Sequence, residues 1–171
     1  MEKVEELVEE ALNRRPITEK VFELAGAYFC LSILTSILSM LGLMNNAQVS
    51  ATATALSFSF VIMFPLFVLT EDINLLRKLA TFPFSIVMSF ITWLLAPEPR
   101  EYLLKNPQYA LPYISKNFLF PWIFAIILLI VWVYFKDYFS GRRILIKYGA
   151  PTLLTLVVGY FIGVLMFGGL R

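Results

Sequence analysis

The chain has 171 residues, of which 59% are hydrophobic and 15% are charged, and its formal net charge at pH 7 is +2. This apolar content, with a mean hydropathy of +0.76, exceeds what the core of a soluble domain of this size can bury, so the excess must face lipid. The basic residues lie in short clusters instead of one stripe, which argues against nucleic acid as a partner, and the absence of histidine excludes His-dependent catalytic, haem and zinc sites.

Residues 1–20 are predicted to form an amphipathic helix on the cytoplasmic side, ahead of the membrane domain. The apolar side chains Val4, Leu7, Val8 and Leu12 recur every three or four residues, and glutamates occupy the opposite face. An acidic face is repelled by anionic lipid, so a protein surface suits this helix better. We expect the four apolar side chains to dock either on the basic cytoplasmic ends of the spans or on a separate protein subunit.

Residues 21–171 contain five apolar runs of about the 20 residues that a helix needs to cross the hydrocarbon core of a bilayer. The predicted fold class is therefore an all-α integral membrane protein, a five-helix transmembrane bundle. The predicted spans are Leu24–Met44, Val49–Leu69, Leu79–Ala96, Phe118–Phe135 and Tyr148–Leu170.

Three prolines lie inside these runs. Pro83 and Pro121 fall about one turn after the predicted starts of their spans, where the N–H that proline lacks has no intrahelical partner. Pro65 falls late in the second run, where we expect a kink. Between the third and fourth runs, residues 97–117 interleave prolines with tyrosines. This pattern predicts a partly ordered segment at the headgroup layer or, alternatively, an external vestibule for a substrate.

Lysine and arginine predict the orientation, because cytoplasmic loops carry an excess of these residues. With the N-terminus in the cytoplasm, ten of the 14 basic side chains lie on the cytoplasmic side and four on the other. The turn at residues 45–48 carries no charge, as expected for an outside hairpin. We therefore predict a multi-pass protein of the cell membrane with its N-terminus in the cytoplasm and its C-terminus outside.

Small and hydroxylated side chains mark one face of each of the first two spans. Ser32 and Ser36 in the first span, and Ala55 and Ser59 in the second, recur every four residues and allow a neighbouring helix to approach closely. We expect these spans to form a tight hairpin along this face. A sharper hypothesis is that the hydroxyl groups line a polar path, although hydroxyls in spanning helices usually bond to their own backbone.

The last span carries two glycines four residues apart, Gly159 and Gly163. This spacing allows two helix backbones to approach closely in lipid, where packing drives association. Both glycines are candidate packing residues, either against another span of the same chain or across a homodimer.

Ionisable groups inside hydrocarbon are functional candidates because they are costly there, and this chain has almost none. Glu23 lies in the first turn of the first span, and Glu71 and Asp72 follow the second span, near basic residues that can pair with them. The alternative is a site for a cation or a coupling proton at the inner mouth of a path. We predict no catalytic residue, no cofactor and no metal site.

These patterns predict a non-enzymatic accessory or scaffold subunit that acts through helix packing and its acidic N-terminal helix. Its expected partners are membrane lipid and either another protein or further copies of the chain. The alternative is a small oligomeric transporter or channel with a hydroxyl-lined path between the first two spans. A lipid-modifying enzyme is disfavoured because the acidic groups near the spans are interfacial.

Overall fold

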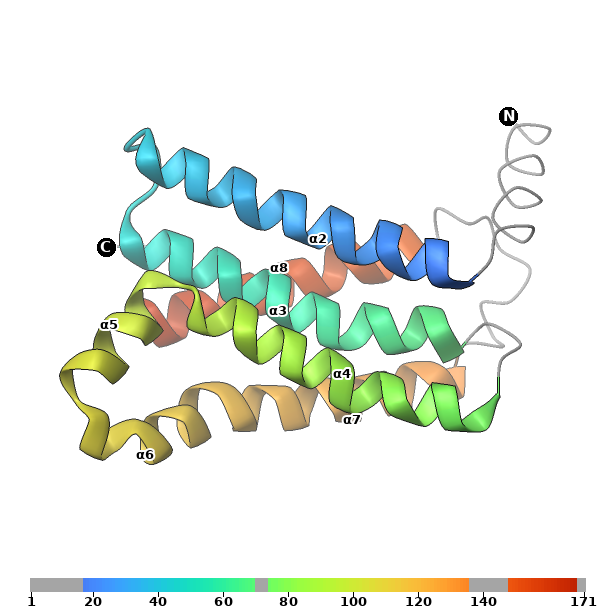
Figure 1. Ribbon diagram of the computed structural model, residues 1–171. Coiled ribbons are helices and arrows are strands. Elements are labelled where there is room, and N and C mark those ends of the chain that lie inside the picture. The colour runs from blue at the N-terminus through green and yellow to red at the C-terminus, as the bar shows by residue number, and fades with distance from the viewer. Residues whose placement is uncertain (1–16, 70–73, 136–147, 169–171) are drawn as a thin grey trace.

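The computed structural model describes residues 17–69, 74–135 and 148–168 (Figure 1). These residues form helices joined by short turns, and no strand occurs among them. Five helical segments among the described residues are long and apolar enough to cross a membrane, which confirms the number of candidate spans predicted from hydropathy. The five segments indicate a multi-pass membrane protein.

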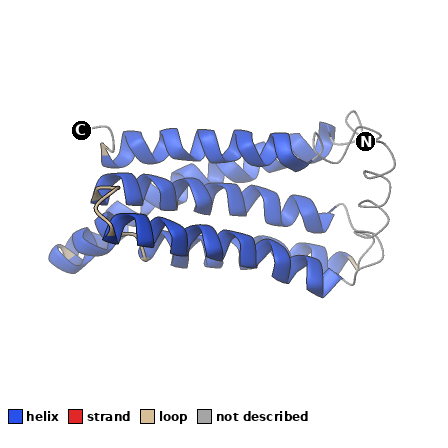
Figure 2. Cartoon of the chain, turned by 90° about the horizontal axis from the view of Figure 1, so that it is seen from above, coloured by secondary structure: helices blue, strands red, loops and turns tan. Residues whose placement is uncertain are grey.

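The long helices run back and forth along the bundle (Figures 1 and 2). They are α2 Ile17–Met40, α3 Asn46–Leu69, α4 Leu75–Leu94, α7 Phe120–Phe135 and α8 Ala150–Phe167. Between α4 and α7 the chain forms four short helical elements at one end of the bundle. They are α5 Pro97–Lys105, η1 Pro107–Tyr109, α6 Ala110–Ile114 and η2 Ser115–Leu119.

Local side-chain bonds explain where α3 and α4 begin. The N–H of Gln48 donates to Oδ1 of Asn45 at 2.8 Å, and the N–H of Asn45 donates to Oε1 of Gln48 at 2.9 Å. This reciprocal pair satisfies two backbone donors at the start of α3. At the start of α4, the N–H of Leu76 donates to Oδ1 of Asn74 at 3.2 Å. The turn before α3 contains Gly42 with a φ of +72°, a conformation that glycine adopts at low cost.

Helix α3 lies at the centre of the bundle and contacts α2, α4, α7 and α8. In its most apolar stretch 78% of the residues are buried, compared with 6% in α2 and 17–22% in the other three segments. A helix that is apolar on all sides and contacts neighbours all round has no polar face to present. The other long helices therefore surround α3 and expose apolar side chains outwards.

Helix α8 makes the most extensive contact with α3, and its glycines make this possible. A Cβ atom built on Gly159 would lie 2.9 Å from Cα of Ala55, and one built on Gly163 would lie 2.6 Å from Cα of Ala51. Only a residue without a side chain allows the two backbones to come this close. The small-residue face of α3 is thus occupied by α8, and not by α2 as the expected tight hairpin required.

An aromatic cluster joins α3, α4 and the start of α7. The ring centroid of Phe118 lies 5.4 Å from that of Trp93 and 5.3 Å from that of Trp122. The centroids of Phe58 on α3 and Trp122 are 5.2 Å apart. All four side chains are buried. Large rings in edge and tilted contacts bury much area per residue, so this cluster holds α4 and α7 against the central helix.

Several predicted boundaries differ from the structure. The first long helix ends at Met40 and not at Met44, because the chain turns at Gly42. The third begins at Leu75, so Pro83 lies well inside α4 and not in its first turn, as predicted. Residues 97–117 are largely helical instead of partly ordered. The predicted N-terminal amphipathic helix falls mostly on residues 1–16, outside the described residues.

Pro121 is the second residue of α7 and follows an unusually wide helical turn. The N–H of Phe120 bonds to the carbonyl oxygen of Ser115, five residues earlier, instead of four. A proline ring collides with the carbonyl four residues before it in a regular helix, and the wide turn relieves this crowding. The short elements after α5 can therefore continue into α7 as one apolar segment, Pro107–Trp132.

Candidate functional site

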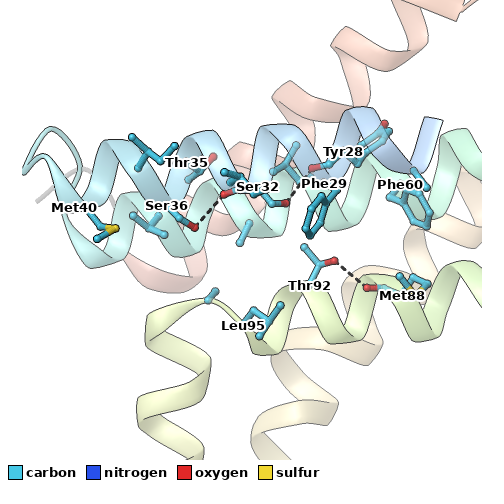
Figure 3. Close-up of a pocket in the computed structure, with 17 residues that line it drawn as sticks. Tyr28, Phe29, Ser32, Thr35, Ser36, Met40, Phe60, Met88, Thr92 and Leu95 are labelled. Atoms are coloured by element: carbon cyan, nitrogen blue, oxygen red, sulfur yellow. Dashed lines mark hydrogen bonds between the residues drawn. The ribbon is translucent and has the colours of Figure 1, made fainter. Parts of the chain in front are cut away.

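A groove of about 450 Å³ lies between α2, α3 and α4 (Figure 3). One wall is the length of α2 from Ala25 to Met40, and the facing wall is the last part of α4 with Met88 and Leu95. The floor is α3, from Val49 to Phe60. The groove is thus bounded by the most exposed helix of the bundle and by the most buried one.

Aromatic contacts hold α2 to α3 at one end of the groove. The ring of Tyr28 meets the ring of Phe60 edge to face, with centroids 5.3 Å apart. Phe60 stacks on Phe64 at 5.1 Å, and Phe64 contacts Phe84 of α4 at 5.4 Å. This row of rings links α2, α3 and α4 at the Tyr28 end of the groove. The other end lies beside Met40, where α2 finishes.

The hydroxyl of Tyr28 begins a chain of hydrogen bonds that crosses three helices. Tyr28 Oη lies 2.6 Å from Ser59 Oγ, which lies 2.9 Å from Thr155 Oγ1. Thr155 uses its single hydroxyl hydrogen on the carbonyl oxygen of Thr152, at 2.9 Å. Ser59 therefore donates to Thr155, and Tyr28 donates to Ser59. The chain of donors fastens α2 to α3 and α3 to α8 in the apolar interior.

The other hydroxyl groups in the groove wall bond to their own helices. Ser32 donates to the carbonyl of Tyr28 at 3.0 Å, Thr35 to that of Leu31 at 2.8 Å, and Ser36 to that of Ser32 at 3.0 Å. On the opposite wall, Thr92 donates to the carbonyl of Met88 at 2.9 Å. None of the described residues that line the groove is charged. Because every hydroxyl hydrogen in the lining is already bonded, the groove suits a ligand that needs no hydrogen-bond acceptor.

Of the four residues expected to line a polar path, two line the groove and two are buried in packing contacts. Ser32 and Ser36 lie in the wall of the groove on α2. Ala55 is buried against Gly159, and Ser59 is buried between Tyr28 and Thr155, so both belong to the packing of α3. The second packing glycine, Gly163, lies against the backbone of α3 as well. Sequence periodicity found these small residues but not the partner of each face.

Of the three acidic candidates, the structure describes only Glu23. Glu23 is exposed on α2 and is not among the residues that line it. Glu71 and Asp72 lie outside the described residues, and so do the four candidate docking residues near the N-terminus, Val4, Leu7, Val8 and Leu12. Within the described ranges, no group of three or more acidic, cysteine or histidine side chains is placed to hold a metal ion.

Sequence reasoning missed the residues that shape the groove, Tyr28 and Phe60 above all. Tyr28 offered one signal, because a tyrosine hydroxyl inside an apolar span needs a hydrogen-bond partner there. Phe60 offered none, since a phenylalanine in a span can face either lipid or protein. Comparisons with protein-family models, curated proteins and solved structures found no match.

Proposed function

We propose that the chain is a non-enzymatic multi-pass protein of the cell membrane that serves as an accessory or scaffold subunit. The observation that supports this role most strongly is the exposure of α2. Only 6% of its apolar stretch is buried, far less than in any other candidate span. A helix held to the bundle along one edge leaves most of its apolar surface for other molecules in the membrane.

Several polar side chains of the described spans join one helix to another. Ser59, Tyr28 and Thr155 bond to one another between helices, and Ser89 donates to the carbonyl of Ser57 on α3 at 2.9 Å. These bonds fix helix positions. They support a role based on shape and surface over one based on reactive groups.

The proposed orientation keeps the N-terminus in the cytoplasm and the C-terminus outside. Arg77 and Lys78 then lie near the cytoplasmic boundary, and α5 lies on the outer side, at the far end of α4. The test uses single cysteines in a Cys30→Ser background. A cysteine at Asn46 should react with an impermeant maleimide in intact cells, and one at Arg77 only after permeabilisation. The reverse pattern would overturn the orientation.

The subunit role is tested on tagged protein extracted gently from its native membrane. We expect a second protein in fixed stoichiometry that is lost when residues 2–13 are deleted, while the thermal stability of the deleted form stays unchanged. A second variant, Gly26→Leu, changes the exposed surface of α2 without disturbing the bundle, because a Cβ at Gly26 meets nothing within 4 Å. A homo-oligomer without a second protein in every preparation would contradict the accessory role.

A small transporter remains the second candidate, because Ser32 and Ser36 of the predicted path do line the groove. Ser36→Leu would then change solute flux into proteoliposomes without unfolding the bundle, since Ser36 is exposed in the groove wall. Bulky replacements at Ala55 or Ser59 are unsuitable tests, because these side chains are buried in packing contacts. Unchanged flux across a panel of ions and solutes would remove this candidate.

A further inference from the structure

The groove between α2, α3 and α4 has the dimensions of one hydrocarbon chain. Its ends on α2, Ala25 and Met40, are 15 residues apart, or about 22 Å along the helix axis. A straight hydrocarbon chain advances about 1.25 Å per carbon, for bonds of about 1.5 Å at tetrahedral angles. The groove therefore matches the length of about 18 carbons.

Its volume is of the order that one such chain needs. If a methylene group takes about the volume of a water molecule in the liquid, roughly 30 Å³, a volume of about 450 Å³ corresponds to about 15 such groups. A helix of the same length is about 10 Å wide with its side chains and fills roughly 1800 Å³. A helix can lie across the mouth of the groove but cannot enter it.

Most of the groove lies in the half of the spans on the α5 side. Met40 is the last residue of α2, so this end lies at the boundary of the apolar region. Tyr28 and Phe60 lie near the middles of α2 and α3. The 12 residues from Met40 to Tyr28 span about 18 Å, and half of a hydrocarbon core is about 15 Å thick. A lipid chain that enters beside Met40 would end near the rings of Tyr28 and Phe60.

The chemistry of the groove lining also favours a hydrocarbon chain over a polar ligand. The groove contains no charge, and its hydroxyl hydrogens are bonded within the protein. A polar or charged ligand would lose its hydration there without compensation, whereas an alkyl chain loses none. The segment before Ile17 is unsuitable for the same reason, because its five glutamates would lose their hydration in an uncharged groove.

From these observations we infer that the groove binds one acyl chain of a glycerophospholipid from the leaflet on the α5 side. The inference rests on the proposed membrane insertion but not on the subunit role. The bound chain fills the space between α2 and α4, so that lipid completes the contact of α2 with the bundle. The lipid is then a structural ligand whose loss weakens the attachment of α2.

The test uses the purified full chain in detergent with phosphatidylcholine that carries a diazirine in one acyl chain. Two probes are compared, one with the diazirine near the carbonyl and one with it near the chain end. The first should label peptides around Met40 and Leu95, and the second should label peptides around Tyr28 and Phe60. Labelling that does not depend on the diazirine position would overturn the inference.

Two serine variants on α2 provide the matched control. Ser36 lines the groove, whereas Ser39 lies one turn further along and does not. Ser36→Phe should reduce labelling of the groove peptides at least fivefold, and Ser39→Phe should leave it within twofold of the wild type. Circular dichroism and thermal unfolding verify that both variants are folded. Equal labelling in the two folded variants would refute binding in the groove.

Lipid binding and the subunit role are separated because labelling is measured on the purified chain, whereas partner binding is measured on protein extracted gently from its native membrane. If Ser36→Phe releases a co-purifying protein in the second assay while lipid labelling is unchanged in the first, the groove mouth serves a helix of that protein and the lipid proposal is wrong. If lipid labelling falls and no partner exists, the groove proposal holds and the subunit role fails.

Discussion

Replacing Gly163 by alanine tests the close contact between α8 and α3. The added Cβ would lie 2.6 Å from Cα and 2.7 Å from the carbonyl oxygen of Ala51. Both are backbone atoms, so no side chain can rotate away. To reach 3.4 Å, the lower limit of ordinary contact, α8 must move away from α3 by about 0.8 Å.

The cost of this movement follows from the contacts that it weakens. A gap of roughly 0.5–1 Å already forfeits a quarter to a half of the dispersion attraction between packed atoms. A shift of the whole helix would also lengthen the bond between Ser59 and Thr155, now 2.9 Å, beyond hydrogen-bonding range. Overpacking of this kind costs about 1–3 kcal/mol. For a chain of this size, roughly 2–4 °C is lost per kcal/mol, so we expect a fall in Tm of about 2–12 °C.

The assay is thermal unfolding in detergent, with Gly26→Ala as the matched control. Gly26 lies on α2 with nothing within 4 Å of its added Cβ. Glycine is a poor helix former, so alanine there should add up to about 1 kcal/mol of stability. The Tm should therefore stay unchanged or rise. If Gly163→Ala unfolds at the same temperature as Gly26→Ala, the close approach of α8 and α3 is not what stabilises the bundle.

The remaining predictions use the same unfolding assay. Ser59→Ala should destabilise the chain by about 1 kcal/mol, because the hydroxyl joins Tyr28 to Thr155. Ser57→Ala should be neutral or stabilising, because Ser57 Oγ is buried and has no hydrogen-bond partner among the described residues; equal losses in the two serine variants would contradict this. Tyr28→Phe should cost about as much as Ser59→Ala, and the double variant should lose less than the sum; additive losses would show that the two hydroxyls are not coupled.

The number of spans could be predicted from sequence because a helix needs about 20 apolar residues to cross hydrocarbon. The five runs correspond to α2, α3, α4, the segment Pro107–Trp132 and α8. Boundaries were less predictable. Gly42 ended the first helix early, and the chain from residue 97 to residue 119 became helical although its prolines indicated irregular structure. Orientation and partners stay predictions from charge and exposed surface.

Only part of the candidate site could be predicted from the sequence. Ser32 and Ser36 were found by their spacing and do line the groove. Ala55 and Ser59 have the same spacing, yet they pack in the interior against α8 and Tyr28. Spacing shows that a face is narrow, but not which helix will cover it, because several helices can present complementary faces.

The sequence by itself determined that the chain contains five apolar segments, each long enough for a helical span, since both properties depend on local composition. Only the tertiary structure decided that α3 is central, that the face with Ala51 and Ala55 receives α8, and that a groove opens between α2 and α4. The physical reason is that lipid is as apolar as the side chains. Hydropathy therefore cannot distinguish a face that packs on protein from one that meets lipid, and the fit between particular helices makes that choice.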